Sequence, residues 1–264
     1  MRWILSLLCG LWLWGMTFSP AIAANYTEAE LQKGQALAEE AIEATQKGDF
    51  ATADDDWTQL VQQFPENPAV WSNRGNLRVR QNRLDDAIAD YNRAVELAPT
   101  APDPYLNRGA VYEAQGRYQD AIADYEQVLT ISPDDPMAYN NRGNAKAGQG
   151  QWQDAIVDYQ KAVEIAPDFA FARSNYALAL YQTGAQAEAL KEMRNIARKY
   201  PRFPDVRAAL TAVLWEQGQQ GEAESNWVAA IGMDSRYQDI DWVKRIRRWP
   251  PVMATALEKF LNLE

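Results

Sequence analysis

The feature that most constrains this chain of 264 residues is an internal repeat of 34 residues. The tripeptide Asn-Arg-Gly occurs at 73–75, 107–109 and 141–143, so each copy follows the last by 34 residues. Extending the glycine column in both directions gives a small residue at every step: Ala41, Gly75, Gly109, Gly143, Ala177 and Thr211. Periods of about 20–50 residues indicate a linear array of similar structural units.

Two further columns keep the same register and predict how the units are packed. Twelve residues after the small residue there is always an alanine: Ala53, Ala87, Ala121, Ala155, Ala189 and Ala223. Four residues later there is always a large side chain: Trp57, Tyr91, Tyr125, Tyr159, Met193 and Trp227. Small residues on successive helices allow close approach of the two backbones, and we expect the large residue to fill the groove beside them.

Breakers at fixed positions predict two helices in each unit. The first helix meets a residue that tolerates positive φ, namely Gly48, Asn82, Gly116, Gly150, Gly184 or Gly218. The second helix meets a proline, which cannot continue it, at Pro65, Pro99, Pro133, Pro167 or Pro201. Each unit is therefore a helix hairpin that buries its apolar face only against its neighbours.

The pattern resembles the tetratricopeptide repeat (TPR) family over about 200 residues. The six units are 34–67, 68–101, 102–135, 136–169, 170–203 and 204–237. Units two to four fit best, whereas the others read Glu39-Glu40-Ala41, Asn175-Tyr176-Ala177 and Ala209-Leu210-Thr211 where Asn-Arg-Gly stands. The resemblance implies an all-α, right-handed α-solenoid whose first helices line a concave surface.

Segments outside the repeats are predicted at both ends. Residues 1–23 have a positive start, an apolar stretch and Ala21-x-Ala23, which is typical of a secretory signal peptide; an uncleaved anchor is the alternative. Cys9 lies too early for a lipoprotein site. Thr27-x-x-Glu30 has the form of a capping box at the start of the first helix. Residues 238–264 are predicted to form a helical cap, with one helix over 239–249 and another over 252–261 covering the end of the last repeat. We expect Trp242, Ile246, Trp249, Leu257 and Phe260 to make that contact.

Composition excludes several classes of function. The chain after residue 23 has no cysteine and no histidine, so thiol chemistry, imidazole chemistry and Cys/His metal sites are excluded. Its 36 acidic and 25 basic residues give a net charge of −11, which disfavours nucleic acid as a partner. Asp54-Asp55-Asp56 and Asp134-Asp135 lack the glycine and distal glutamate of a calcium loop. We expect no metal, no cofactor and no catalytic site.

The arginine of the tripeptide has a candidate partner in its own unit. Sixteen residues later there is an aspartate, which predicts the ion pairs Arg74–Asp90, Arg108–Asp124 and Arg142–Asp158. The alternative is a basic stripe that binds an acidic ligand. The first unit departs from the pairing, since it keeps Asp56 while Glu40 replaces the arginine.

The asparagines are the candidate binding residues. One column contains Asn73, Asn107, Asn141 and Asn175, and Asn76, Asn140 and Asn144 lie beside it. A primary amide donates and accepts hydrogen bonds, so this column resembles the asparagine ladder with which some TPR superhelices hold an extended peptide backbone. Phe171, Tyr181 and Trp215 are predicted apolar anchors in the same groove. The alternative is that the asparagines only join helices within and between repeats.

A chaperone-type carboxylate clamp, a TPR subclass, is disfavoured because its lysine positions are Ser72 and Met137. One basic cluster stands out near the C-terminus: Lys244, Arg245, Arg247, Arg248 and Trp249. We expect this tail to dock on the acidic body, since residues 24–237 have a net charge of −12. An alternative is contact with anionic lipid headgroups.

The predicted function is that of an exported scaffold that binds an extended segment of another protein. The alanine-ended signal, the six units and the closing "RRWPPVMATALEKFL" resemble TPR proteins of the cyanobacterial and plastid thylakoid lumen. That resemblance implies a part in assembly or maintenance of photosynthetic membrane complexes. The bacterial periplasm is the alternative location, and a structural protein at the envelope surface is the alternative function.

Overall fold

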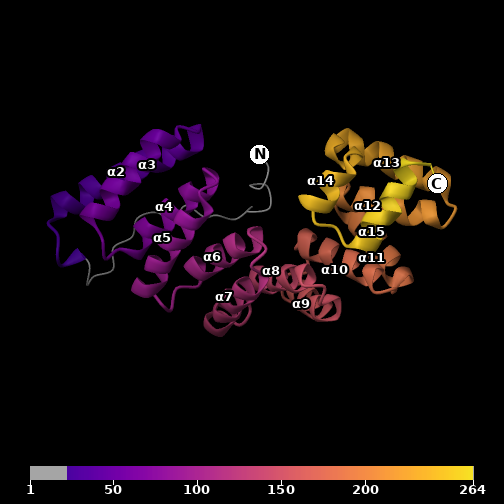
Figure 1. Ribbon diagram of the computed structural model, residues 1–264, viewed down its shortest axis with the longest axis horizontal. Helices are drawn as coiled ribbons and strands as arrows, with labels where there is room; N and C mark the ends of the chain where they lie inside the picture. Colours follow the sequence, from indigo (N-terminus) through magenta and orange to yellow (C-terminus); the bar gives the residue numbers. More distant parts are fainter. Residues whose placement is uncertain (1–22, 264) are drawn as a thin grey trace. The chain divides into compact units, whose positions relative to one another are not determined.

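The computed structural model describes residues 23–263, and every regular element in that range is a helix (Figure 1). Residues 1–22, with nearly all of the predicted signal segment, lie outside the described residues. The helices fall into two compact units, one ending at Pro133 and one beginning at Asp134. The predicted all-α array of helix hairpins followed by a capping helix is confirmed.

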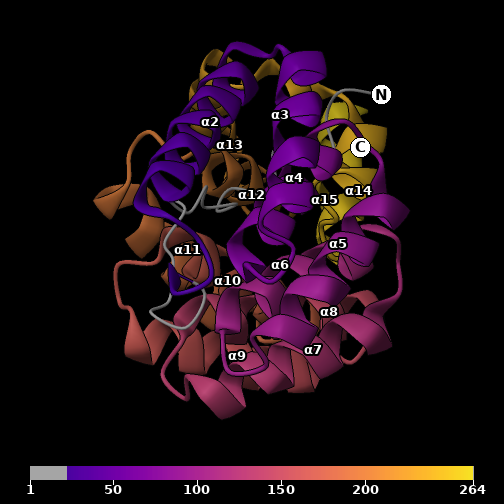
Figure 2. The ribbon, with the colours of Figure 1, turned by 90° about the vertical axis from the view of Figure 1, so that its left-hand side faces the viewer.

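The first unit consists of three hairpins, each with a first and a second helix in contact (Figure 2). Its helices are α2 (Glu28–Lys47), α3 (Phe50–Gln63), α4 (Pro68–Arg80), α5 (Leu84–Leu97), α6 (Pro102–Ala114) and α7 (Tyr118–Ile131). The predicted capping box is present, since the Thr27 hydroxyl accepts from the Glu30 amide and the Glu30 carboxylate accepts from the Thr27 amide.

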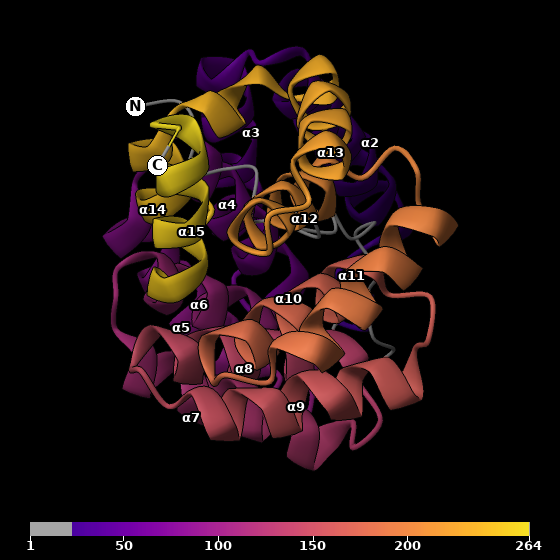
Figure 3. The same ribbon diagram turned by 90° about the vertical axis from the view of Figure 1, so that its right-hand side faces the viewer.

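The second unit consists of three more hairpins and a C-terminal segment (Figure 3). The hairpin helices are α8 (Pro136–Gly148), α9 (Trp152–Ile165), α10 (Ala170–Gln182), α11 (Gln186–Lys199), α12 (Pro204–Glu216) and α13 (Gln220–Met233). The segment that follows contains a 3₁₀ turn, η2 (Ser235–Gln238), and the helices α14 (Ile240–Arg245) and α15 (Pro251–Leu261).

The reversal inside each hairpin depends on one residue with a left-handed backbone. All six predicted breakers have positive φ, between 61° and 89°: Gly48, Asn82, Gly116, Gly150, Gly184 and Gly218. Asn82 is the one that is not glycine, and asparagine is among the residues that tolerate this conformation. The positions of these breakers in the sequence therefore predict where the first helix ends in every repeat.

The small and large columns pack against each other as predicted. The alanine column is completely buried in all six repeats. A Cβ added to Gly75, Gly109 or Gly143 would lie 2.7–2.8 Å from a ring carbon of Tyr91, Tyr125 or Tyr159 in the paired helix. The glycine therefore creates the space that the tyrosine ring fills.

Gly109→Ala is expected to destabilise the first unit. The added methyl group would lie 2.7 Å from a ring carbon of Tyr125, whose side chain is fully buried, so the ring would have to shift. Overpacking of this kind costs about 1–3 kcal/mol. Urea unfolding followed by circular dichroism measures the loss. Gly221→Ala, at a helical glycine with no neighbour within 4 Å of the added Cβ, is the control. A Gly109→Ala protein as stable as that control would contradict the packing argument.

The C-terminal cap differs from its prediction in two respects. The first predicted helix, over 239–249, ends at Arg245, and Arg248 has a φ of +53°. The second helix, α15, packs on α10 and α12, which are the first helices of the last two repeats, rather than on the end of the array alone (Figure 3). Trp249, Leu257 and Phe260 are buried, as expected. The surface that they help to cover includes the first helices of the last two repeats, whereas the prediction placed them on the end of the last repeat.

Candidate protein-binding surfaces

In the first unit, the asparagines of α4 and α6 join neighbouring helices. The Tyr91 hydroxyl donates to Asn76 Oδ1 at 2.7 Å, and Asn107 Nδ2 donates to the same oxygen at 3.3 Å. Asn73 and Asn76 are 1% and 0% exposed. The prediction that these two side chains contact a partner is therefore wrong for this structure, because the neighbouring helices cover them.

In the second unit, the corresponding amides form a similar network between α8 and α10. Asn175 Nδ2 donates to Asn140 Oδ1 at 3.0 Å and to Asn144 Oδ1 at 3.1 Å. Asn144 Oδ1 also accepts from the Tyr159 hydroxyl at 2.9 Å, and Asn140 Nδ2 donates to Asn141 Oδ1 at 3.1 Å. Asn140 is 5% exposed and so is also withdrawn from partners. These bonds correspond to the alternative interpretation, in which the asparagines join the repeats.

Three amide groups keep hydrogen-bonding capacity after these contacts are made. Asn107 Oδ1, Asn141 Nδ2 and Asn175 Oδ1 have no hydrogen-bond partner among the described residues, and all three side chains are partly exposed. Asn141 and Asn175 lie on the adjacent helices α8 and α10 of the second unit. The amides that remain for a partner are fewer than the sequence column predicts.

Of the three predicted apolar anchors, one is exposed. Phe171, in the first turn of α10, is 48% exposed and packs edge-to-face on Phe203 with ring centroids 5.2 Å apart. Tyr181 is 2% exposed and its hydroxyl donates to Glu216, so it is a core residue. Burial raises the pKa of Tyr181, and the Glu216 carboxylate adds to that effect. Trp215 is half-buried and packs edge-to-face on Phe260 of α15.

Helix α15 explains why Tyr181 and Trp215 are not available. It crosses the C-terminal ends of α10 and α12, where the Val252 amide donates to Gln182 Oε1 at 2.9 Å and Lys259 Nζ contacts Glu216 Oε1 at 2.9 Å. Phe171 lies at the other end of α10. The first-helix face of the second unit is therefore covered by the chain's own C-terminus at one end of α10 and is exposed at the other.

The C-terminal segment is held by one buried carboxylate. Asp205, in the first turn of α12, is 2% exposed. Its Oδ1 accepts from the Tyr237 hydroxyl at 2.6 Å, Arg247 Nε at 2.9 Å and Trp249 Nε1 at 3.0 Å, and its Oδ2 accepts from the Ser174 hydroxyl at 3.0 Å. Burial alone would raise the pKa of Asp205, but the charge of Arg247 and these hydrogen bonds hold it below its usual value.

This network corrects the predicted basic patch. Arg247 and Trp249 point to Asp205 and are not available to a membrane or partner. Lys244 is paired with Glu258 at 2.7 Å, and Arg245 is exposed. Arg247 and Trp249 therefore dock the tail on the body of the protein, as expected, whereas Lys244 pairs within the tail. Asp205 could not be predicted as the acceptor, because the equivalent positions in the other repeats do not form a column of acidic residues.

The three predicted ion pairs are all present, and each is bidentate. The distances from Nε and from a terminal nitrogen of the guanidinium to the carboxylate are 2.6–3.0 Å for Arg74–Asp90, Arg108–Asp124 and Arg142–Asp158. The aspartates are 1–5% exposed. Each guanidinium also lies over an aromatic ring of its own helix, at 4.9–5.6 Å from the ring centroid. These arginines are structural, which argues against a basic stripe for an acidic ligand.

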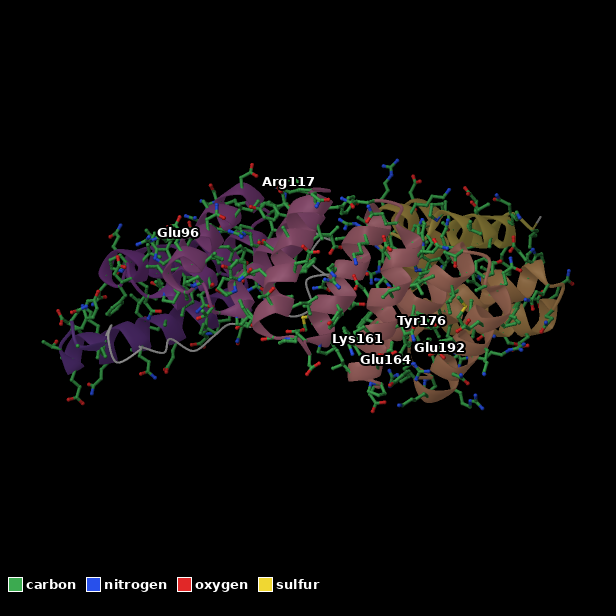
Figure 4. The ribbon with its side chains drawn as sticks, turned by 90° about the horizontal axis from the view of Figure 1, so that it is seen from below. Glu96, Arg117, Lys161, Glu164, Tyr176 and Glu192 are labelled. Carbon is green, nitrogen blue, oxygen red and sulfur yellow. The ribbon has the colours of Figure 1, made fainter. Side chains whose placement is uncertain are left out.

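Repeats five and six keep the same contact with an arginine that was not predicted, because it lies three residues before the position of the tripeptide arginine. Arg173 pairs with Glu192, and Arg207 donates to Asn226 Oδ1 at 2.8 Å. Glu192 and Asn226 occupy the same column as Asp158. Tyr176 stands where the tripeptide arginine would be in repeat five, and Figure 4 shows it near Glu192. The arginine is displaced by three residues along the first helix. Because positions three apart share one face of a helix, its side chain can still reach the same acceptor.

Within residues 23–263, no group of three or more acidic, histidine or cysteine side chains is arranged to hold a metal ion. No helix in the same range is long and apolar enough to span a membrane.

Comparisons with known proteins agree with this geometry. Residues 75–116 and 114–150 match a model of the TPR repeat, and residues 136–169 match a second model of the tetratricopeptide repeat. No curated protein sequence matches the chain.

Similar solved structures share the fold. They include YrrB, described as a TPR protein with an unusual peptide-binding site, at 22% identity and a TM-score of 0.55, covering 77% of this chain and 97% of YrrB. MamA is 24% identical with a TM-score of 0.56, covering 60% of this chain and 93% of MamA. A TPR protein from Parabacteroides merdae is 20% identical with a TM-score of 0.66, covering 88% of this chain and 86% of that one. The matched segments carry the packed glycine–tyrosine pairs and the pairs Arg108–Asp124 and Arg142–Asp158 described above, so residues 75–169 consist of tetratricopeptide repeats and the described chain has the fold of a TPR solenoid.

Proposed function

We propose that this protein is a scaffold that binds an extended segment of a partner protein on the first-helix face of α8 and α10. The observation that carries the proposal is the exposure of Phe171, which is 48% exposed one helical turn before Asn175. Residues four apart lie on one face of a helix, so an apolar anchor and the Oδ1 of Asn175 face the same side. The scaffold class is that of the family, which typically has no catalytic activity.

The open amides suit a polypeptide backbone as the ligand. Asn175 Oδ1 can accept from a backbone N–H, and Asn141 Nδ2 on α8 can donate to a backbone C=O. Each such bond contributes only about 0.5–1.5 kcal/mol net. Full burial of a phenylalanine contributes about 1.5–3 kcal/mol, so covering the 48% of Phe171 that is exposed is expected to add about 0.8–1.5 kcal/mol, as much as one of these hydrogen bonds.

Phe171→Ala is expected to weaken partner binding by about four- to tenfold, since 1.4 kcal/mol corresponds to a factor of ten in Kd and Phe171 adds about 0.8–1.5 kcal/mol. The partner is first identified with a photo-crosslinking residue at position 171 of the full chain and mass spectrometry, and its Kd is then measured by calorimetry. Val157→Ala, at an apolar residue of α9 that is 65% exposed, is the matched control and should leave Kd within twofold. Equal Kd values for the two variants would refute the proposal.

We also propose that the protein acts outside the cytoplasm, in the thylakoid lumen or the bacterial periplasm, on photosynthetic membrane complexes. The support is the composition of residues 1–23 and the resemblance of the closing segment to thylakoid-lumen TPR proteins. Amino-terminal sequencing of the protein from its native source is expected to start at Ala24. A chain that starts at Met1 would contradict cleavage of the signal segment.

A further inference from the structure

In five of the six repeats, one position on the second helix receives an arginine from the first helix. The acceptors at this position are Asp90, Asp124, Asp158, Glu192 and Asn226, spaced by 34 residues. The arginine comes from the tripeptide in repeats two to four and from three residues earlier in repeats five and six. The repeats themselves therefore show that this position is a site for a guanidinium group.

The first repeat keeps the acceptor and lacks the arginine. The equivalent residue is Asp56 on α3, and the positions that supply a cation elsewhere are Leu37, Glu40 and Ala44 on α2. Asp56 is 9% exposed, and it forms no hydrogen bond or ion pair with any of the described residues. The Asp56 carboxylate therefore has no partner to offset the part of its hydration that it loses, and it remains accessible to a group from outside the chain.

The electrostatic surroundings of Asp56 favour a cation. Burial raises the pKa of Asp56, and the negative charges of Glu40, Asp55 and Asp49 raise it further. The unit as a whole has the same bias, since residues 24–133 contain 19 acidic and 9 basic residues whereas residues 134–264 contain 17 and 16. Nearly all of the net negative charge of the protein thus lies in the unit that contains this site.

We propose that Asp56 and Glu40 form a receptor for one arginine side chain of a partner protein, which completes in trans the contact that the other repeats make in cis. Arginine fits because its planar guanidinium donates two parallel hydrogen bonds to a carboxylate, as it does to Asp90, Asp124 and Asp158. Lysine, with a single ammonium group, cannot make this pair of bonds. The site uses different residues from the surface at Phe171, and the proposal does not depend on that surface.

The test is a titration of the full chain with N-acetyl-Gly-Arg-Gly-amide at low ionic strength, followed by NMR of backbone amides. Saturable shifts centred on α2 and α3, with a Kd of about 1 mM or tighter, are expected for one charge-assisted bidentate contact. The same peptide with citrulline in place of arginine has nearly the same shape without the charge and should cause no shifts there. Equal responses to the two peptides, or no response to either, would overturn the proposal.

Two variants of the site and one matched control sharpen the test. Asp56→Asn removes the receptor charge, and Glu40→Arg fills the site with the arginine that repeats two to four contain, so each should weaken peptide binding at least tenfold. Glu39→Gln removes one negative charge at an exposed neighbour of Glu40 and should stay within twofold of the natural protein. Glu40→Arg should also raise Tm by about 2–4 °C, because it restores the missing ion pair. Undiminished binding by either site variant, or a Tm that is unchanged or lowered in Glu40→Arg, would contradict the assignment.

Discussion

Replacing Asp205 by asparagine is expected to release the C-terminal segment from the last two repeats. Asp205 is the common acceptor for Tyr237, Arg247 and Trp249, and the Arg247 side chain is 13% exposed. The neutral amide would leave the buried guanidinium without a counter-charge. Breaking a buried pair by removing one partner costs about 3–5 kcal/mol, which exceeds what most single contacts contribute.

Because repeat proteins are stabilised mainly by nearest-neighbour contacts, the loss should be local. Amide hydrogen exchange of α15 measures it: protection of α15 should fall by about two orders of magnitude or more, since each 1.4 kcal/mol is a factor of ten. Protection of α4 to α7 should stay unchanged. Asp241→Asn, at an exposed residue of α14, is the control. Full protection of α15 in the Asp205→Asn protein would show that the apolar contacts of Leu257 and Phe260 are sufficient.

The same carboxylate gives the docking a defined dependence on pH. The folded-state pKa of Asp205 is lower than the unfolded value of about 3.9, so its contribution is complete above that value and is lost as pH falls through the folded-state pKa. Docking should therefore be constant from about pH 5 to 8 and weaken below about pH 4. The NMR signal of the Trp249 indole N–H, which donates to Asp205 Oδ1, reports this change directly.

Arg108→Ala is expected to destabilise the first unit by about 3–5 kcal/mol. Asp124 is 5% exposed and would lose its counter-charge and the two bonds that Arg108 donates at 2.6 and 2.9 Å. The guanidinium would also be lost from its contacts with Asn92 and the ring of Tyr105. Urea unfolding of the full chain measures the effect as a lower midpoint.

A double-mutant cycle separates the pair from its surroundings. Arg108→Ala together with Asp124→Ala should cost less than the sum of the single changes, because no unpaired charge remains. Arg93→Ala is the matched control, since Arg93 makes ion pairs with Glu66 and Glu96 on an exposed surface. Such pairs contribute little, so its midpoint should hardly move. A fully additive cycle would indicate that Arg108 acts through packing alone.

Most of the fold could be predicted because the repeat is a physical constraint that recurs six times. The left-handed residue, the buried alanine and the filled groove each depend on local geometry. The same sequence positions therefore predict them in every repeat. The intra-repeat ion pairs follow for the same reason. Arg173 and Arg207 escaped prediction because a side chain three residues earlier reaches the same acceptor, so the contact is preserved while the residue column is not.

The binding residues were harder to predict, because a column of amides has two uses. Asn76 and Asn175 have the residue type of a peptide ladder, yet their hydrogen bonds connect neighbouring first helices. Sequence alone does not show which partner satisfies a given amide. The position of α15 was equally hidden, because contacts such as Val252 with Gln182 join residues 70 apart and follow no period.

The network around Asp205 has a consequence for how the protein is made. Arg247 and Trp249 follow Asp205 by 42 and 44 residues, so they leave the ribosome after the last hairpin is complete. Chains emerge with the N-terminus first, and the early repeats can pack while synthesis continues. The contacts of the final repeat are then completed only when Arg247 and Trp249 arrive, so a product cut short before residue 247 would leave the Asp205 carboxylate without its counter-charge.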